Sequence, residues 1–243
     1  MRLNGVELTS VHRALSIEKE IPPGTAPRAQ ETIQTATGEI ITEERLEAGE
    51  YIVRANIFAG TNKEAWNVRE LLANWASLRG LGTAELIPTH RPSRCYDARL
   101  KSISDPEFVH GGAKVEIRFL IPRPAARSTT QSEASGVGGV TMNIGGTYEC
   151  RPALSQTLSA DQDGLVWVMD GIPFLTITGA LSAGQTVRMD IKNESLTIDG
   201  EHAESRVNMS GTKWRPGYWP GVHTIESSDT AGSFSARWYD EWL

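Results

Sequence analysis

The residues of this sequence that could bind a metal or act as nucleophiles are few and widely separated. The histidines are His12, His90, His110, His202 and His223, and the cysteines are Cys95 and Cys150. The histidines show neither HExxH nor any close pairing, and two cysteines in different halves are too few for a disulfide framework or a zinc site. We expect no metal site, with His110 and His202 exposed near turns and both cysteines as buried or half-buried free thiols.

Carboxylates offer the more serious enzymatic hypothesis, because a glycosidase needs two of them about 5–10 Å apart. The segment "VRMDIKNE" offers Asp190 alone, since Arg188 and Lys192 hold the neighbouring positions on its face. This arrangement predicts an ion-pair ladder. The glycine-rich "SGVGGV" has Thr141 where a dinucleotide fingerprint needs its third glycine, and no G-x-S-x-G elbow occurs. We therefore expect no catalytic residue, no cofactor site and no enzyme.

Aromatic residues gather in "KWRPGYWPGVHTI", which runs from Lys213 to Ile225. Tryptophans held on a stiff loop are typical of a sugar-binding platform, but the same prolines and glycines also suit a corner between two strands. We expect the corner, with Trp214 and Trp219 capping the end of a β-sandwich. A carbohydrate-binding module that uses this sandwich is the alternative.

Composition and charge exclude several classes of protein. The 243 residues carry a formal charge of −6, which argues against specific nucleic-acid binding. No segment approaches 18 uncharged apolar residues, so we expect no membrane span. The N-terminus reaches charged residues too soon for a signal peptide, which indicates folding in a cytosol.

One helix is predicted in the N-terminal half, within "TNKEAWNVRELLANWASLRG". Thr61 and Glu64 form a capping box, and Gly80 suits the helix end. The apolar stripe expected to face the core consists of Val68, Leu71, Leu72, Trp75 and Leu78. We expect both Trp66 and Trp75 to be core anchors.

Strands are predicted around this helix, at 50–58, 84–87, 95–103 and 113–121, with a loose tip between the last two. Further upstream, 31–50 suggests a polar hairpin that turns at Thr37 and Gly38. Its small apolar content indicates that it projects, or borrows burial from a neighbouring subunit. The acidic run Glu43, Glu44, Glu47 and Glu50 is interpreted as a solvated face.

The middle of the chain is rich in proline, glycine and small polar residues from Ile121 to Val140, which is typical of a linker. We predict an α+β N-terminal domain at 1–124, a flexible linker at 125–139, and a C-terminal antiparallel β-sandwich at 140–243. In the sandwich, Val187, Met189 and Ile191 share one strand face, and Asp199-Gly200 predicts a tight hairpin turn. The fold class is therefore mainly β, with a sandwich of the jelly-roll kind.

The order of these segments resembles the distal tail proteins of long, non-contractile-tailed bacteriophages. In the N-terminal half the resemblance lies in "EYIVRANIF", "WNVRELLANWASL", "CYDARLKSI" and "KVEIRFLIPRP". In the C-terminal half it lies in "NIGGTYECRPAL", "VRMDIKNESLTIDG", "YWPGVHTI" and "ARWYDEWL". It covers nearly the whole chain. The carbohydrate-binding inserts that some members carry are not visible here.

The resemblance implies a structural part of a phage tail tip, or of a tail-like particle. Six copies would form a hub ring, with the N-terminal domains on the tail tube protein and galectin-like C-terminal domains facing outward. Partners would be a tail-associated tip or fibre protein and further copies of the chain. The location would be the virion tail tip, after assembly in the cytoplasm of the host bacterium.

Overall fold

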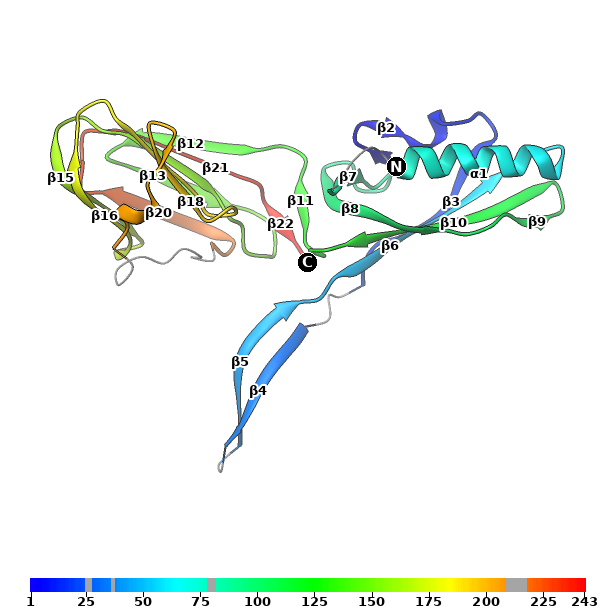
Figure 1. The fold of residues 1–243 in the computed structure, drawn as a ribbon, viewed down its shortest axis with the longest axis horizontal. Coiled ribbons are helices and arrows are strands. Elements are labelled where there is room, and N and C mark those ends of the chain that lie inside the picture. Colours follow the sequence, from blue (N-terminus) through cyan, green and yellow to red (C-terminus); the bar gives the residue numbers. More distant parts are fainter. Residues whose placement is uncertain (25–27, 36–37, 78–81, 209–217) are drawn as a thin grey trace. The chain divides into compact units, whose positions relative to one another are not determined.

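The computed structural model describes residues 1–24, 28–35, 38–77, 82–208 and 218–243, with backbone alone for 28–46 (Figure 1). The chain divides into two compact units. Unit 1 is Met1–Thr129 together with Leu243, and unit 2 is Thr130–Trp242. Most of the described residues lie in strands, and one α-helix is present among them, which confirms the mainly β prediction.

Unit 1 is built on an antiparallel sheet in the order β2-β1-β7-β8-β10-β6-β3, with β9 beside β10 and β11 beside β8. These strands are β1 (Arg2–Leu3), β2 (Val6–Glu7), β3 (Leu15–Ile21), β6 (Gly49–Ile57), β7 (Ala84–Ile87), β8 (Arg94–Ile103), β9 (Glu107–Val109), β10 (Gly112–Ile121) and β11 (Ala126–Ser128). A short 3₁₀ helix, η1 (Leu8–Ser10), follows β2. The predicted strands of this half are confirmed, but the tip before β10 contains β9 and is not loose.

Helix α1 (Asn62–Ala76) begins at the predicted cap. The Thr61 hydroxyl accepts a hydrogen bond from the Glu64 amide at 3.2 Å, whereas the Glu64 carboxylate accepts from the Gly60 amide at 3.0 Å. In a regular capping box the carboxylate would accept from the amide of Thr61, the N-cap residue; here it accepts from the preceding residue. The predicted helix end at Gly80 lies outside the described residues.

The buried side of α1 packs on one face of the sheet, as Figure 1 shows. Val68, Leu72 and Trp75 join this core, and Trp75 meets Phe119 edge to face at 6.4 Å. The prediction was wrong for Trp66 and Leu71, which remain 41% and 42% exposed. Ala65 and Ala76 complete the buried side instead, so the true stripe is narrower and built partly from small residues. Leu78 lies outside the described residues.

A separate two-stranded sheet is formed by β4 (Arg28–Thr35) and β5 (Gly38–Leu46). Its register pairs Thr35 with Gly38 and Ile33 with Ile40, with a bulge at Glu31/Thr32. This confirms the predicted hairpin, although the predicted turn residue Thr37 is outside the described residues.

Unit 2 consists of two antiparallel sheets, in the orders β12-β21-β14-β17-β18-β19 and β13-β20-β15-β16. The strands are β12 (Ser132–Val137), β13 (Gly139–Ile144), β14 (Ala153–Thr157), β15 (Gln162–Met169), β16 (Ile172–Leu181), β17 (Thr186–Asp190), β18 (Ser195–Ile198), β19 (Glu201–His202), β20 (Gly221–Ser227), β21 (Ser233–Trp238) and β22 (Glu241–Trp242). A second 3₁₀ helix, η2 (Glu204–Arg206), follows β19.

The core of unit 2 lies between these sheets and follows the predicted alternation. Val187, Met189 and Ile191 are fully buried, and Asp199 and Gly200 take the positive φ values of a tight hairpin turn between β18 and β19. The antiparallel two-sheet arrangement was therefore predicted correctly.

The predicted flexible linker at 125–139 was wrong. Strand β12 pairs along its whole length with β21, and the boundary between the units falls at Thr129/Thr130. The glycines here serve close packing: a Cβ on Gly136 would lie 2.2 Å from the carbonyl oxygen of Gly139, and one on Gly139 would lie 2.4 Å from that of Ile225. This glycine corner carries the chain from one sheet to the other.

Candidate assembly surfaces

The histidines and cysteines are spread over both units. Cys95 and Cys150 are buried thiols outside any disulfide, as predicted, and burial raises the pKa of the Cys95 thiol to about 12. His110 and His202 are exposed at turns, also as predicted. In the described part of the chain, no group of three or more His, Cys, Asp or Glu residues is arranged to hold a metal ion.

Asp190 serves a turn. Its carboxylate accepts hydrogen bonds from the Asn193 amide at 3.1 Å and the Asn193 side chain at 2.8 Å. These bonds close the connection between β17 and β18. The carboxylate that the sequence offered for catalysis therefore holds the turn that joins β17 to β18.

The aromatic stretch near the end of unit 2 differs from the prediction in one respect. Tyr218 is fully buried and joins the core, whereas Trp219 is 54% exposed and meets Tyr148 edge to face at 5.9 Å. Tyr218 is thus the residue that caps the sandwich here, and Trp214 lies outside the described residues. Neighbouring side chains of this segment point to opposite sides, so one of the two adjacent aromatic residues is buried and the other exposed. The number of aromatic residues in the sequence does not predict which one is buried.

His223 holds this region together. Its Nδ1 lies 2.8 Å from the Asp170 carboxylate and its Nε2 lies 2.7 Å from the Trp219 carbonyl oxygen. A hydrogen bond from the Thr224 amide outweighs partial desolvation and, together with His223, lowers the pKa of Asp170. These contacts fix the start of β20 against the β15–β16 turn.

Charged residues cover the face of the unit 1 sheet that points away from α1. Arg54 pairs with Glu116 at 3.0 Å, Arg118 pairs with Glu116 at 2.7 Å, and Glu50 pairs with both Lys101 and Arg118. The Lys101 hydrogen bond lowers the pKa of Glu50. Glu50 thus belongs to an ion-pair network on the sheet, while Glu47 is exposed as predicted for the acidic run. The side chains of Glu43 and Glu44 are outside the described part.

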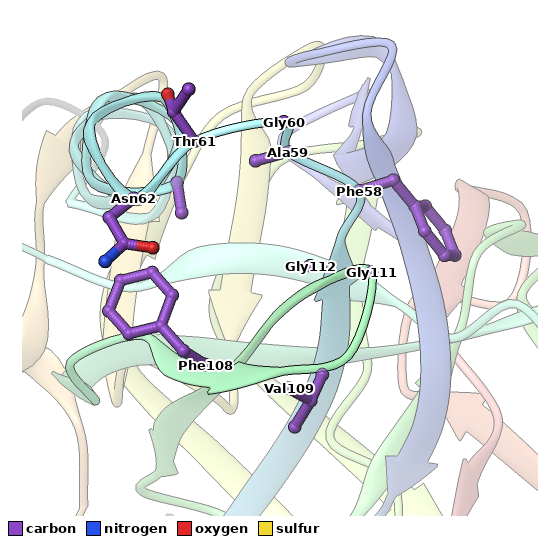
Figure 2. A pocket seen from close by; sticks show the side chains of 10 residues that line it. Phe58, Ala59, Gly60, Thr61, Asn62, Phe108, Val109, Gly111 and Gly112 are labelled. Carbon is purple, nitrogen blue, oxygen red and sulfur yellow. The ribbon is translucent and has the colours of Figure 1, made fainter.

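A hollow of about 580 Å³ lies at the end of unit 1 where α1 begins (Figure 2). Three exposed apolar side chains line it: Phe58 after β6, and Phe108 and Val109 in β9. Figure 2 shows Phe108 below the first turn of α1, next to Asn62, and Phe58 on the other side of the hollow. We call this the tip hollow. No polar triad or ion pair marks it, so sequence motifs gave no signal for it.

A second exposed apolar surface lies beside the later part of α1. It consists of Val6 in β2 and Leu71 in α1, and we call it the helix-side patch. Strand β2 lies against this part of α1, because the Trp75 indole donates a hydrogen bond to the Val6 carbonyl oxygen at 3.4 Å. Trp75 is one helical turn after Leu71. Both surfaces are apolar and suited to protein contacts.

Comparison with solved structures finds the same fold in a hub protein of a bacteriophage adsorption apparatus. That protein is SPP1 Dit, described as a paradigm of the hub adsorption apparatus in phages that infect Gram-positive bacteria. It aligns with a TM-score of 0.76 and 15% identity, over 99% of this chain and 98% of its own. The likeness to phage tail-tip proteins inferred from the sequence is thereby confirmed at the level of the fold.

Two structures of the activated phage P2 baseplate also align, one with Ca and one with Sr. Their TM-scores are 0.43 and 0.42 and their identities 9% and 10%, over 92% of this chain and 90% of theirs. No protein-family model matches the sequence, and no curated protein matches it. None of the helices described is long and apolar enough to cross a membrane.

Proposed function

We propose that the chain is a structural component of the tail tip of a phage or phage-like particle. It forms a hub ring that joins the tail tube protein to tip, baseplate or host-recognition proteins. The observation that carries this proposal is the alignment with SPP1 Dit over nearly the full length of both chains, with both units included. The role is mechanical, with no catalytic step and no cofactor.

Unit 1 is the ring-forming part of this proposal, and six copies close the ring. Unit 2 is the outward, galectin-like part that meets a tail-associated tip or fibre protein. The chain binds no nucleic acid specifically, in keeping with its charge of −6. Its place is the virion tail tip, reached by assembly in the cytoplasm of the host bacterium.

The structure gives little support to the carbohydrate-binding alternative. A sugar platform needs aromatic faces open to solvent, but Trp219 stands edge to face with Tyr148. Trp167 and Trp238 in the same unit are buried in the core. We therefore assign unit 2 a protein-binding role.

Immunogold electron microscopy tests the proposed location. An antibody raised against the full chain is applied to tailed particles released by the bacterium that carries the gene. We expect gold at one end of the tail, on the side away from the capsid. Labelling along the whole tail, or particles that lack the chain, would contradict the proposal.

A further inference from the structure

Among the described residues up to Thr129, the exposed large apolar side chains fall into two groups. They are Val6, Phe58, Trp66, Leu71, Phe108 and Val109. Phe58, Phe108 and Val109 line the tip hollow, and Trp66 flanks it, one turn after Asn62 on the same side of α1. Arg69 shows that this side of α1 faces the end of β8, because its guanidinium donates a hydrogen bond to the Ile103 carbonyl oxygen at 3.3 Å. Val6 and Leu71 form the other group.

The two groups face different directions. Leu71 follows Trp66 by five residues, which places it about 140° further around the helix axis. The helix-side patch also lies toward the end of α1, whereas the tip hollow lies at its start, and the helix is about 22 Å long. One flat contact cannot cover both groups. The first group surrounds a recess, and the second consists of two exposed apolar side chains beside the later part of the helix.

The charges of the two units indicate which of them can meet its own copy. Residues 1–129 hold seventeen Lys and Arg against sixteen Asp and Glu, so unit 1 has a net charge of +1. Residues 130–243 hold seven against fourteen, so their net charge is −7. Copies of unit 2 repel one another, while copies of unit 1 approach with almost no electrostatic cost.

We propose that the helix-side patch of one copy enters the tip hollow of the next copy, so that unit 1 associates head to tail. The occupant of the hollow is a second copy of this chain, because a single near-neutral unit carries both the recess and an apolar surface to fill it. Aromatic residues are enriched at the centres of protein interfaces, as Phe58, Trp66 and Phe108 are here. Head-to-tail contacts between unlike surfaces close into a ring when the rotation per copy divides the circle. This inference rests on the proposed hub function and adds its contact surface.

Two single charge substitutions in the full chain test the contact. Leu71→Glu places a negative charge in the helix-side patch, and Phe108→Glu places one in the tip hollow. Native mass spectrometry should show the wild type as a closed ring of six times the 26.6 kDa chain and each variant as a monomer. Val222→Glu, on an exposed position of unit 2, is the matched control and should leave the ring intact. Thermal melting within a few degrees of wild type will show that the variants are folded.

Mixing the two variants separates a head-to-tail contact from a symmetric one. The Phe108→Glu chain keeps its patch and the Leu71→Glu chain keeps its hollow, so an equimolar mixture should give a mixed dimer that grows no further. A mixture that stays monomeric, a ring retained by both variants, or a wild type that is monomeric at every concentration would overturn the proposed contact. These outcomes leave the hub function to be judged by its own test, since gold labelling of the tail end does not depend on which surfaces join the copies.

Discussion

Units 1 and 2 enclose their cores differently. Unit 1 packs one helix on one face of its sheet and carries an ion-pair network on the other face. Unit 2 closes its core between two sheets, and its strands supply nearly all of the covering surface. Both units leave large apolar side chains exposed. In unit 1 they include Phe58, Phe108 and Val109 around the start of α1, and in unit 2 they include Val137, Ile172 and Val222 on strands. The comparison teaches that the two units expose apolar side chains on different elements, and the proposed contact between copies uses those that border the helix of unit 1.

The largest effect is expected from removing one core tryptophan in each unit. Trp75→Ala in unit 1 and Trp167→Ala in unit 2 should each cost about 3–5 kcal/mol of unfolding free energy, because both indoles are buried. Differential scanning calorimetry should show that each substitution lowers one transition and leaves the other in place. A single transition lowered equally by either substitution would break the comparison between two units.

Backbone packing at the glycine corner gives the next largest effect. Gly139→Ala puts a methyl group 2.4 Å from the Ile225 carbonyl oxygen, so the strands of unit 2 must shift. We expect a loss of about 2–3 kcal/mol in the stability of unit 2, measured by urea denaturation. Gly24→Ala in unit 1 is the control, because nothing lies within 4 Å of its added Cβ. If the urea midpoint of Gly139→Ala equals that of the wild type, the glycine corner can shift to admit a methyl group and the close-packing interpretation is wrong.

Acid should weaken unit 2 through Asp229. Burial raises the pKa of this carboxyl, but hydrogen bonds from Ser159 and from the Gly232 amide outweigh burial and lower the pKa below its ordinary value of 3.8. A lowered pKa in the folded state means that the ionised group stabilises unit 2 above about pH 4. This contribution disappears as the pH falls through the folded pKa.

Asp229→Asn should therefore cost about 1–2 kcal/mol at pH 7, since a charged acceptor of several bonds is replaced by a neutral one. Unfolding followed from pH 7 to pH 2 should show a flatter pH dependence for unit 2 in the variant. Unit 1 should keep its own acid sensitivity, because Glu20 has a pKa lowered by Thr89 and Tyr51 in spite of its burial. An identical pH profile for variant and wild type would contradict this assignment.

The smallest effect is expected from single ion pairs at the surface. Lys114→Met in unit 1 removes the 3.0 Å pair with Glu18, and Glu133→Gln in unit 2 removes the charge from the 3.1 Å pair with Arg237. Exposed pairs contribute about 0–1 kcal/mol, so both melting temperatures should move by only a few degrees. A loss above about 2 kcal/mol in either variant would contradict the assignment of these pairs as weak surface contacts.

Local patterns predicted most strands and the start of α1, because these depend on alternation and capping within a few residues. Helical periodicity separates Trp66 from Trp75, because nine residues place them on opposite sides of α1. The expectation that both are core anchors was wrong because the sheet covers one side of the helix, and that side holds Trp75. Leu71 shows a limit of the pattern itself, since its spacing fits the stripe while Ala76 takes the buried place.

The interpretation of the glycine corner failed for another physical reason. Glycine allows flexibility, but it also allows two backbones to approach within a distance that no Cβ permits. Sequence composition cannot tell these uses apart, because the atoms nearest to Gly138 and Gly139 belong to Thr230 and Ile225, about ninety residues later. The tip hollow was missed for a similar reason: its lining comes from β6, α1 and β9, and none of these contributes a recognisable motif.

The placement of the tip hollow at the start of α1 and of the helix-side patch beside its later part has a geometric consequence for the proposed contact. A closed assembly joined through unlike ends has a rotation axis but no twofold axes across it, so its upper and lower rims are different surfaces. Such an assembly is polar along its rotation axis, whereas a twofold-symmetric dimer has equivalent sides. An adaptor of the proposed kind, between two unlike proteins, needs that polarity, and in the proposed contact it follows from the direction of α1.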